Sequence, residues 1–234
     1  MRNAAIASSI LNTPPVAKVE DFFDMGWDMA RSTLWQNTGK TTPCDDNGED
    51  IIVIEPIVGT EDLVYDGNVS NVPVKVAGNF CDFLTSRGTN QRYATAAFTL
   101  ISQVFEIWMV VENLAGQDFG GWIAYPGAAT FTDRGTGFRT AVGVNAEFAG
   151  AGPADGVVQL MRAVFNGSSS QLYIDGTQVG GDQDAGSNGI TRVALGTNST
   201  QADWRLYEMW VKDGAMGGDA ATVTDLLKTE YGIS

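Results

Sequence analysis

The sequence predicts an all-β protein: a two-sheet antiparallel β-sandwich with one helix at its C-terminus. Short apolar or alternating runs recur along the 234 residues, and such runs are typical of strands. The chain also carries 28 glycines, which suits many short strands joined by turns. Near the end, the dipeptide Asp175-Gly176 separates two strand-like runs, and this arrangement predicts a tight hairpin.

The strand signals are strongest in the second half of the chain. Phe105–Val111 is apolar except for one glutamate and predicts a central strand that is buried on both faces. Val157–Phe165 has one apolar and one mixed face, and a hairpin partner follows it at Gln171–Ile174. Five apolar residues of the predicted strands are expected in the core between the sheets: Trp108, Leu160, Leu172, Leu195 and Leu206.

The last predicted strand, Trp204–Val211, alternates aromatic and other residues. With a strict period of two, one face of this strand carries Trp204, Leu206, Glu208 and Trp210. Both faces carry enough apolar surface to be packed.

The segment Asp219–Tyr231 predicts one amphipathic helix. Asp219 is suited to the N-cap, because its carboxylate can accept hydrogen bonds from the free amides of the first turn. Gly232 supplies a left-handed stop. The apolar residues of the segment form one stripe that should dock on the outside of the sandwich: Val223, Leu226, Leu227 and Tyr231.

Residues 1–30 are expected to form an N-terminal arm, and residues 31–234 the globular domain. Pro14 and Pro15 favour an extended arm, and its large apolar side chains lack the periodicity of a self-contained element. Such side chains need a surface to cover. The arm is therefore expected to bind another protein or a second copy of the chain through six residues: Ile6, Ile10, Leu11, Phe22, Phe23 and Trp27.

The charge of the chain limits its partners. The net charge is −14, and the 14 basic residues are scattered without forming a cluster. Nucleic acids and anionic membrane surfaces both attract clustered basic residues, so neither is expected to bind. No run approaches the length of a membrane span, and the first residues make a poor secretory signal.

Cys44 and Cys81 are the two cysteines of the chain. One disulfide and two buried free thiols are both compatible with the sequence.

The C-terminal order LYIDGTQVGG, ITRVALGTN, WRLYEMWVKD and DLLKTEYGI resembles the concanavalin A-like jelly rolls, the superfamily of laminin-G-like lectins and glucanases. The resemblance covers residues 30–232 and implies a jelly-roll topology. The stretch STLWQNTGKTTPCDDNGEDI also resembles laminin-G-like modules of bacteriophage capsid and tail proteins. It implies a structural protein on the exterior of a virion, either a capsid decoration or a tail component. Other virion proteins or copies of itself would bind the arm, and a cell-surface glycan would be a further contact.

Catalytic residues are mostly missing. The chain has no histidine, which removes the usual general base and the Ser-His-Asp triad. A glycosidase needs only two carboxylates, and glucanases of the superfamily carry them in the pattern Glu-x-Asp-x-Glu. The nearest analogue here begins at Glu208, but Trp210 and Lys212 replace the other two acids. We therefore expect no enzymatic activity.

One acidic turn is a candidate cation site. Its side-chain oxygens and its glycine suit calcium, although the spacing is not that of a helix-flanked calcium loop. The alternative is a solvated acidic turn without a cofactor. The candidate ligands are Asp45, Asp46, Asn47, Glu49 and Asp50.

Trp122 and Tyr125 are the candidate sugar-binding residues. They lie in a glycine-rich segment, and loops often carry recognition on β scaffolds. The alternative is that both aromatic rings fill the core.

The sequence as a whole suggests three functions, ranked from the most to the least favoured: a virion structural protein, a carbohydrate-binding lectin module, and an acidic glycoside hydrolase.

Overall fold

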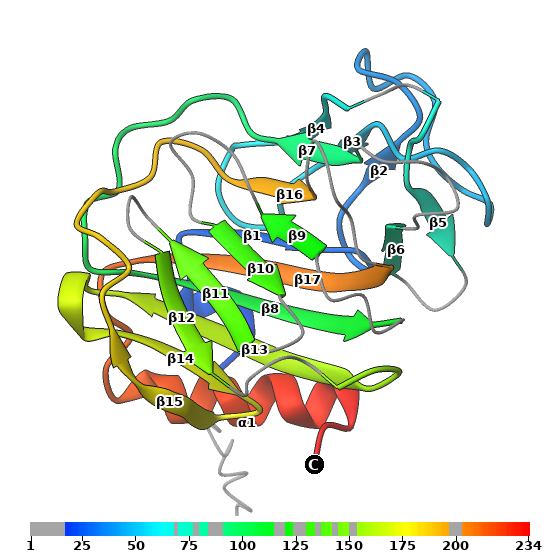
Figure 1. Cartoon of the computed structure of the whole chain (residues 1–234). Helices are drawn as coiled ribbons and strands as arrows, with labels where there is room; N and C mark the ends of the chain where they lie inside the picture. The colour runs from blue at the N-terminus through cyan, green and yellow to red at the C-terminus, as the bar shows by residue number, and fades with distance from the viewer. Residues whose placement is uncertain are drawn as a thin grey trace, which may run out of the picture.

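A computed structural model gives the fold as an all-β sandwich with a C-terminal helix (Figure 1). The structure describes residues 17–67, 70–76, 80–83, 91–114, 120–123, 130–133, 137–141, 145–149, 154–196 and 203–234. Two sheets face each other across a large apolar core, as the sequence predicted.

The first sheet, sheet A, has eight strands in the order β15-β14-β13-β8-β17-β6-β5, with β1 also paired to β17. Its strands are all antiparallel to their neighbours. They are β1 (Met25–Asp28), β5 (Val74–Val76), β6 (Phe80–Phe83), β8 (Phe105–Asn113), β13 (Val158–Phe165), β14 (Ser170–Ile174), β15 (Thr177–Gln183) and β17 (Trp204–Asp213).

The second sheet, sheet B, has nine strands in the order β12-β11-β10-β9-β16-β7-β4-β3-β2. The pairing of β16 with β9 is parallel, and the other pairs are antiparallel. The strands are β2 (Leu34–Trp35), β3 (Val53–Ile54), β4 (Leu63–Tyr65), β7 (Arg92–Ala94), β9 (Gly120–Ile123), β10 (Thr130–Asp133), β11 (Gly137–Ala141), β12 (Asn145–Ala149) and β16 (Ala194–Gly196).

The predicted hairpin is confirmed between β14 and β15. Asp175 and Gly176 both have positive φ, 52° and 84°, as a two-residue turn of this twist requires. The Asp175 carboxylate accepts hydrogen bonds from the Leu160 amide at 2.8 Å and from the Gln159 side chain at 2.9 Å. The turn is thereby tied to β13.

Sheet A packs on both of its faces, which gives the protein two cores. Leu172, Leu195 and Leu206 lie between the sheets, as predicted. Trp108 and Leu160, which were expected beside them, lie in a second core between sheet A and α1 (Asp219–Tyr231). The reason is that a strand buried on both faces sends alternate side chains to opposite cores. Figure 1 shows α1, in red, packed along sheet A.

A β-bulge in β17 changes which residues share a face. Leu206 pairs with Val111, but Glu208 pairs with Val110, so Tyr207 is an extra residue in β17. One extra residue inverts the alternation beyond it. Trp204 and Leu206 therefore face sheet B, whereas Trp210 packs in the second core. The expectation that Trp204 and Trp210 share a face is wrong.

The C-terminal helix docks as expected, with a different N-terminus. Gly218, not Asp219, occupies the N-cap position, and no side chain caps this end. Gly232 ends the helix with φ of 65° and donates its N–H to the Lys228 carbonyl. Val223 and Leu227 are fully buried against sheet A, while Leu226 and Tyr231 are partly buried in the same core.

From Val19 onward, the expected arm is part of the domain. The 3₁₀ helix η1 (Val19–Phe22) leads into β1, which pairs with the part of β17 that lies beyond β6. Phe23 and Trp27 are buried within the chain, and Phe22 packs partly buried against the second core. These three side chains pack into the protein's own cores. The pairing with β1 also covers the part of the β17 edge that β6 does not reach. The other three predicted arm residues, Ile6, Ile10 and Leu11, lie outside the described residues.

Both cysteines are free thiols in the core, so the disulfide alternative does not hold. The Cys44 thiol donates to the Asp50 carbonyl, and the Cys81 thiol lies 4.0 Å from the Tyr93 hydroxyl.

Over the described ranges, α1 and the other helical segments are too short or too polar to cross a membrane.

Candidate functional site: two hollows beside helix α1

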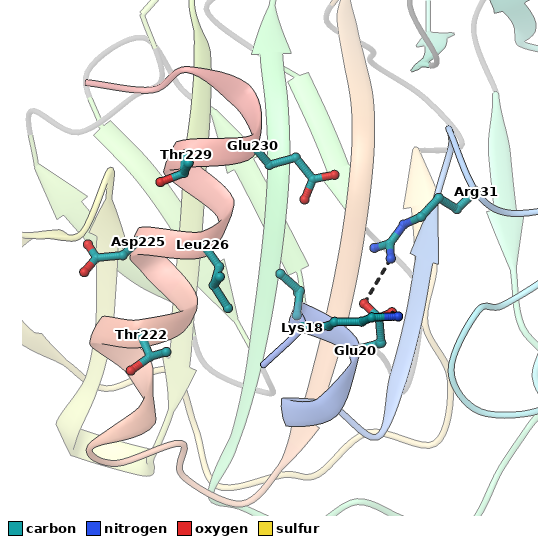
Figure 2. A pocket seen from close by; sticks show the side chains of 9 residues that line it. Lys18, Glu20, Arg31, Thr222, Asp225, Leu226, Thr229 and Glu230 are labelled. Carbon is teal, nitrogen blue, oxygen red and sulfur yellow. Dashed lines mark hydrogen bonds and ion pairs between the residues drawn. The ribbon is translucent and has the colours of Figure 1, made fainter. Parts of the chain in front are cut away.

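Two hollows lie on either side of α1, on the face of sheet A that points away from sheet B. The larger one, which we call the η1–α1 groove, has a volume of about 580 Å³. Figure 2 shows Leu226 pointing from α1 into this groove and Glu230 pointing toward Arg31. Val19 and Leu226 contribute apolar surface, and Thr222 and Thr229 contribute hydroxyl groups.

The cations beside the groove are held by neighbouring acids. Arg31 binds Asp28 through Nε and Glu20 through Nη1, the latter at 2.9 Å. The Lys18 ammonium lies 3.7 Å from the same Glu20 carboxylate. Glu230, at the other side, makes no hydrogen bond or ion pair with any described residue. On the η1 side of the groove, the cations and acids form ion pairs with each other. On the α1 side, the carboxylate of Glu230 has no ion-pair partner among the described residues.

Glu208 lies behind the groove, on the α1 side of sheet A. Its side chain is 0% exposed, and among the described residues neither carboxyl oxygen has a hydrogen-bond partner. The Trp210 indole is close but forms no hydrogen bond of good geometry with it. Burial, with smaller contributions from Asp28 and Glu230, raises the pKa of Glu208 to about 8. This carboxyl is thus largely protonated at neutral pH.

The smaller hollow, the Arg162 pocket, has a volume of about 270 Å³ and lies between α1 and the β13–β14 hairpin. The Arg162 guanidinium forms two hydrogen bonds to the buried Glu106 carboxylate, at 2.9 and 3.0 Å. It also lies 5.0 Å from the ring centroid of Trp108 and 4.7 Å from that of Tyr173. A salt bridge and two aromatic faces hold the guanidinium in one place.

The Arg162 pocket combines several kinds of recognition group. Arg162 Nη1 has no hydrogen-bond partner among the described residues, so it can donate into the pocket. Asp225 offers a carboxylate and Thr224 a hydroxyl, and Tyr173 adds an aromatic surface. Ala220 and Ala221 leave room between these groups.

The sequence did not single out Arg162, Tyr173 or Asp225. A signal was present: Glu106 is the only charged residue in the apolar run Phe105–Val111, and Arg162 is the only charged residue in β13. Two opposite charges in buried neighbouring strands predict a buried pair. The position of Asp225 beside them depends on how α1 crosses the sheet, and no local pattern contains that information.

Hydrogen bonds to neighbouring residues hold the acidic turn. Glu49 accepts hydrogen bonds from the Asp46 amide and the Gln36 side chain, both at 2.9 Å. The Lys75 ammonium binds the backbone carbonyls of Cys44 and Asp45. Across the part of the chain that the structure describes, no group of three or more acids or cysteines could hold a metal ion. The calcium site at Asp45, Asp46, Asn47, Glu49 and Asp50 stays a prediction.

The predicted sugar-binding pair stays a prediction. Trp122 lies in β9, but its side chain is outside what the structure describes, and Tyr125 lies outside the described residues.

Comparisons with known proteins bear on the fold. No protein-family model matches the sequence, and no curated protein matches it. Trypanosoma rangeli sialidase in complex with sialic acid is a structural neighbour, with a TM-score of 0.52 and 11% identity. That match covers 91% of this chain and 37% of the sialidase chain, so this chain spans little more than a third of the sialidase's length.

A second structural neighbour is a separate domain of an enzyme, and the match covers nearly all of that domain. Domain 4 of AbnA, a GH43 extracellular arabinanase from Geobacillus stearothermophilus, was solved in complex with arabinotriose. Its TM-score is 0.51 at 12% identity, and the match covers 87% of this chain and 97% of that chain. At such identities both likenesses establish a shared β-sandwich fold and no more.

Proposed function

We propose that this protein is a non-enzymatic carbohydrate-binding module, which binds sugar on the α1 side of sheet A. The observation that carries the proposal is the Arg162 pocket. Each sugar hydroxyl both donates and accepts hydrogen bonds, and the pocket offers a fixed donor at Arg162 and an acceptor at Asp225. The ring of Tyr173 adds a surface for the apolar face of a sugar.

The size and rigidity of the pocket support this ligand class. A volume of about 270 Å³ is just below the range for drug-sized ligands and suits one sugar ring. Glu106, which holds Arg162, also accepts from Trp108 Nε1 and from the Met216 amide, each at 2.9 Å. The guanidinium is thus ordered before a ligand arrives, which lowers the entropic cost of binding.

The structural neighbours agree with a binding role. The match to the arabinanase domain covers nearly the whole length of that domain, which was solved in complex with an oligosaccharide, arabinotriose. A sandwich of this architecture can therefore serve as a binding unit.

The buried state of Glu208 supports the absence of hydrolytic activity. A glycosidase acid must reach the scissile bond, but Glu208 is 0% exposed. Asp28, its neighbour across the strand pair, is engaged by Arg31.

The virion role remains a prediction from the resemblance of residues 32–51. An arm free to bind a partner was its main physical support, and the burial of Phe23 and Trp27 within the chain weakens that support. The lectin alternative therefore takes first place. A copy number measured in purified virions would test the structural role.

The proposal is tested by screening the full chain on a glycan array and titrating the best ligand by calorimetry. Ala221 lines the Arg162 pocket and is exposed, so Ala221→Leu should fill the pocket and leave the fold intact. We expect it to weaken binding by about tenfold or more, equivalent to roughly 1.4 kcal/mol. The control Ala96→Leu, at another exposed alanine, should bind normally. Absence of any glycan ligand, or normal binding by Ala221→Leu, would overturn the proposal.

A further inference from the structure

We propose that the η1–α1 groove binds a sugar residue that carries a free amino group, with the ammonium beside Glu230. This inference rests on the proposed glycan-binding function and adds a second site, for a charged sugar residue. The groove lies on the opposite side of α1 from the Arg162 pocket, and Asp225 lines both hollows.

Glu230 has no ion-pair partner among the described residues, and Arg31, which attracts it electrostatically, is already bound to Asp28 and Glu20. Arg31 and Lys18 share the acids on the η1 side, namely Glu20 and Asp28. The carboxylate of Glu230 points across the groove toward these groups (Figure 2) but forms no ion pair with a described residue. A ligand with its own positive charge could form an ion pair with the carboxylate of Glu230.

The end of α1 adds to the negative potential at this point. Glu230 lies in the last turn of the helix, where free carbonyl groups carry partial negative charge. Lys228, in the same turn, donates a hydrogen bond from its ammonium to the Asp175 carbonyl at 3.2 Å. Its charge therefore lies near the β14–β15 hairpin and not beside Glu230. The helix end thus favours a cation from outside the chain.

The electrostatic surroundings of Glu230 favour the same ligand. Burial raises the pKa of Glu230; Asp28 and Glu20 add to this, and Arg31 opposes it. A bound ammonium would stabilise the ionised form of Glu230.

The remaining groups fit a sugar ring. The hydroxyls of Thr222 and Thr229 can pair with sugar hydroxyls, and Val19 and Leu226 can contact its apolar face. The volume of about 580 Å³ is in the range for small-molecule sites. The net charge of −14 draws cations toward the protein and repels anionic sugars.

The test compares chitotriose, a trimer of glucosamine, with its fully N-acetylated form, which has the same backbone without the charges. Calorimetric titrations are run on the full chain at about pH 6, where amines of this kind are protonated. We expect chitotriose to bind about tenfold more tightly than the acetylated trimer, as hydrogen bonds to charged groups are stronger than neutral ones.

Two variants locate the effect. Glu230→Gln should remove the preference for chitotriose and leave the affinity for the acetylated trimer unchanged. Asp46→Asn, which removes one exposed acid from the turn beside Lys75, should keep the preference and control for net charge. Equal binding of the two trimers, or a preference that survives in Glu230→Gln, would overturn this inference and leave the proposed function standing. If neither trimer binds and the array is also blank, both proposals fail.

Discussion

Asp28 and Glu208 lie directly opposite each other on β1 and β17, and both side chains are 0% exposed. Asp28 is neutralised by Arg31 and by the backbone amides of Ala30 and Arg31, whereas the carboxyl of Glu208 has no such partners among the described residues. The two facing carboxyls thus have different surroundings: Asp28 is paired with a cation, whereas burial keeps the proton on Glu208 at neutral pH.

The first prediction concerns pH and stability. The pKa of Glu208 is about 8 in the folded protein and near 4.5 when unfolded. Between these values the unfolded chain releases this proton and the folded chain retains it, so the contribution of Glu208 to stability falls as pH rises. Glu208→Gln should therefore gain stability relative to the parent between about pH 5 and pH 8, by roughly 4 kcal/mol at most.

Urea unfolding of both proteins at several pH values measures this difference. A constant difference between them at every pH would show that Glu208 ionises normally in the folded state.

The second prediction concerns the docking of α1. Leu227 is fully buried and Leu226 only partly so. Leu227→Ala should lower the free energy of unfolding by about 2 to 5 kcal/mol, and Leu226→Ala by clearly less, since it removes less buried surface. Similar losses for both variants in urea unfolding would mean that the helix is rotated from the position described.

The third prediction concerns the N-terminal strand. A chain that begins at Met29 lacks β1, Phe23 and Trp27, which fill both cores. We expect it to lose its cooperative thermal transition. A chain that begins at Ala17 keeps every described contact and should retain the transition. If the shorter chain melts cooperatively at the parental temperature, β1 is an arm after all.

The fourth prediction concerns the buried ion pair of the Arg162 pocket. Glu106→Gln leaves the Arg162 guanidinium without its counter-ion beside the second core, and we expect a loss of about 3 to 5 kcal/mol. Arg162→Met with Glu106→Gln removes both charges and should recover part of this loss. Additive losses in urea unfolding of the single and double variants would show that the two residues are not coupled.

The parts of the fold that the sequence predicted are those with local signals. The Asp175-Gly176 turn, the apolar run in β8 and the stripe of α1 each specify their own conformation. The bulge at Tyr207 left no such signal, because an inserted residue of an ordinary strand type looks like any other strand residue in the sequence. The prediction that Trp204 and Trp210 share a face was therefore wrong. Phe23 and Trp27 looked like arm residues because their partners lie in β8 and β17, far along the sequence.

The measurement that tests the account most directly is an NMR titration of isotope-labelled protein with the best ligand from the glycan array. We predict that the largest amide shifts fall on residues 160–162, 173–176 and 220–225, which surround the Arg162 pocket. Shifts concentrated on β9, around Trp122, would contradict it and place sugar recognition on sheet B.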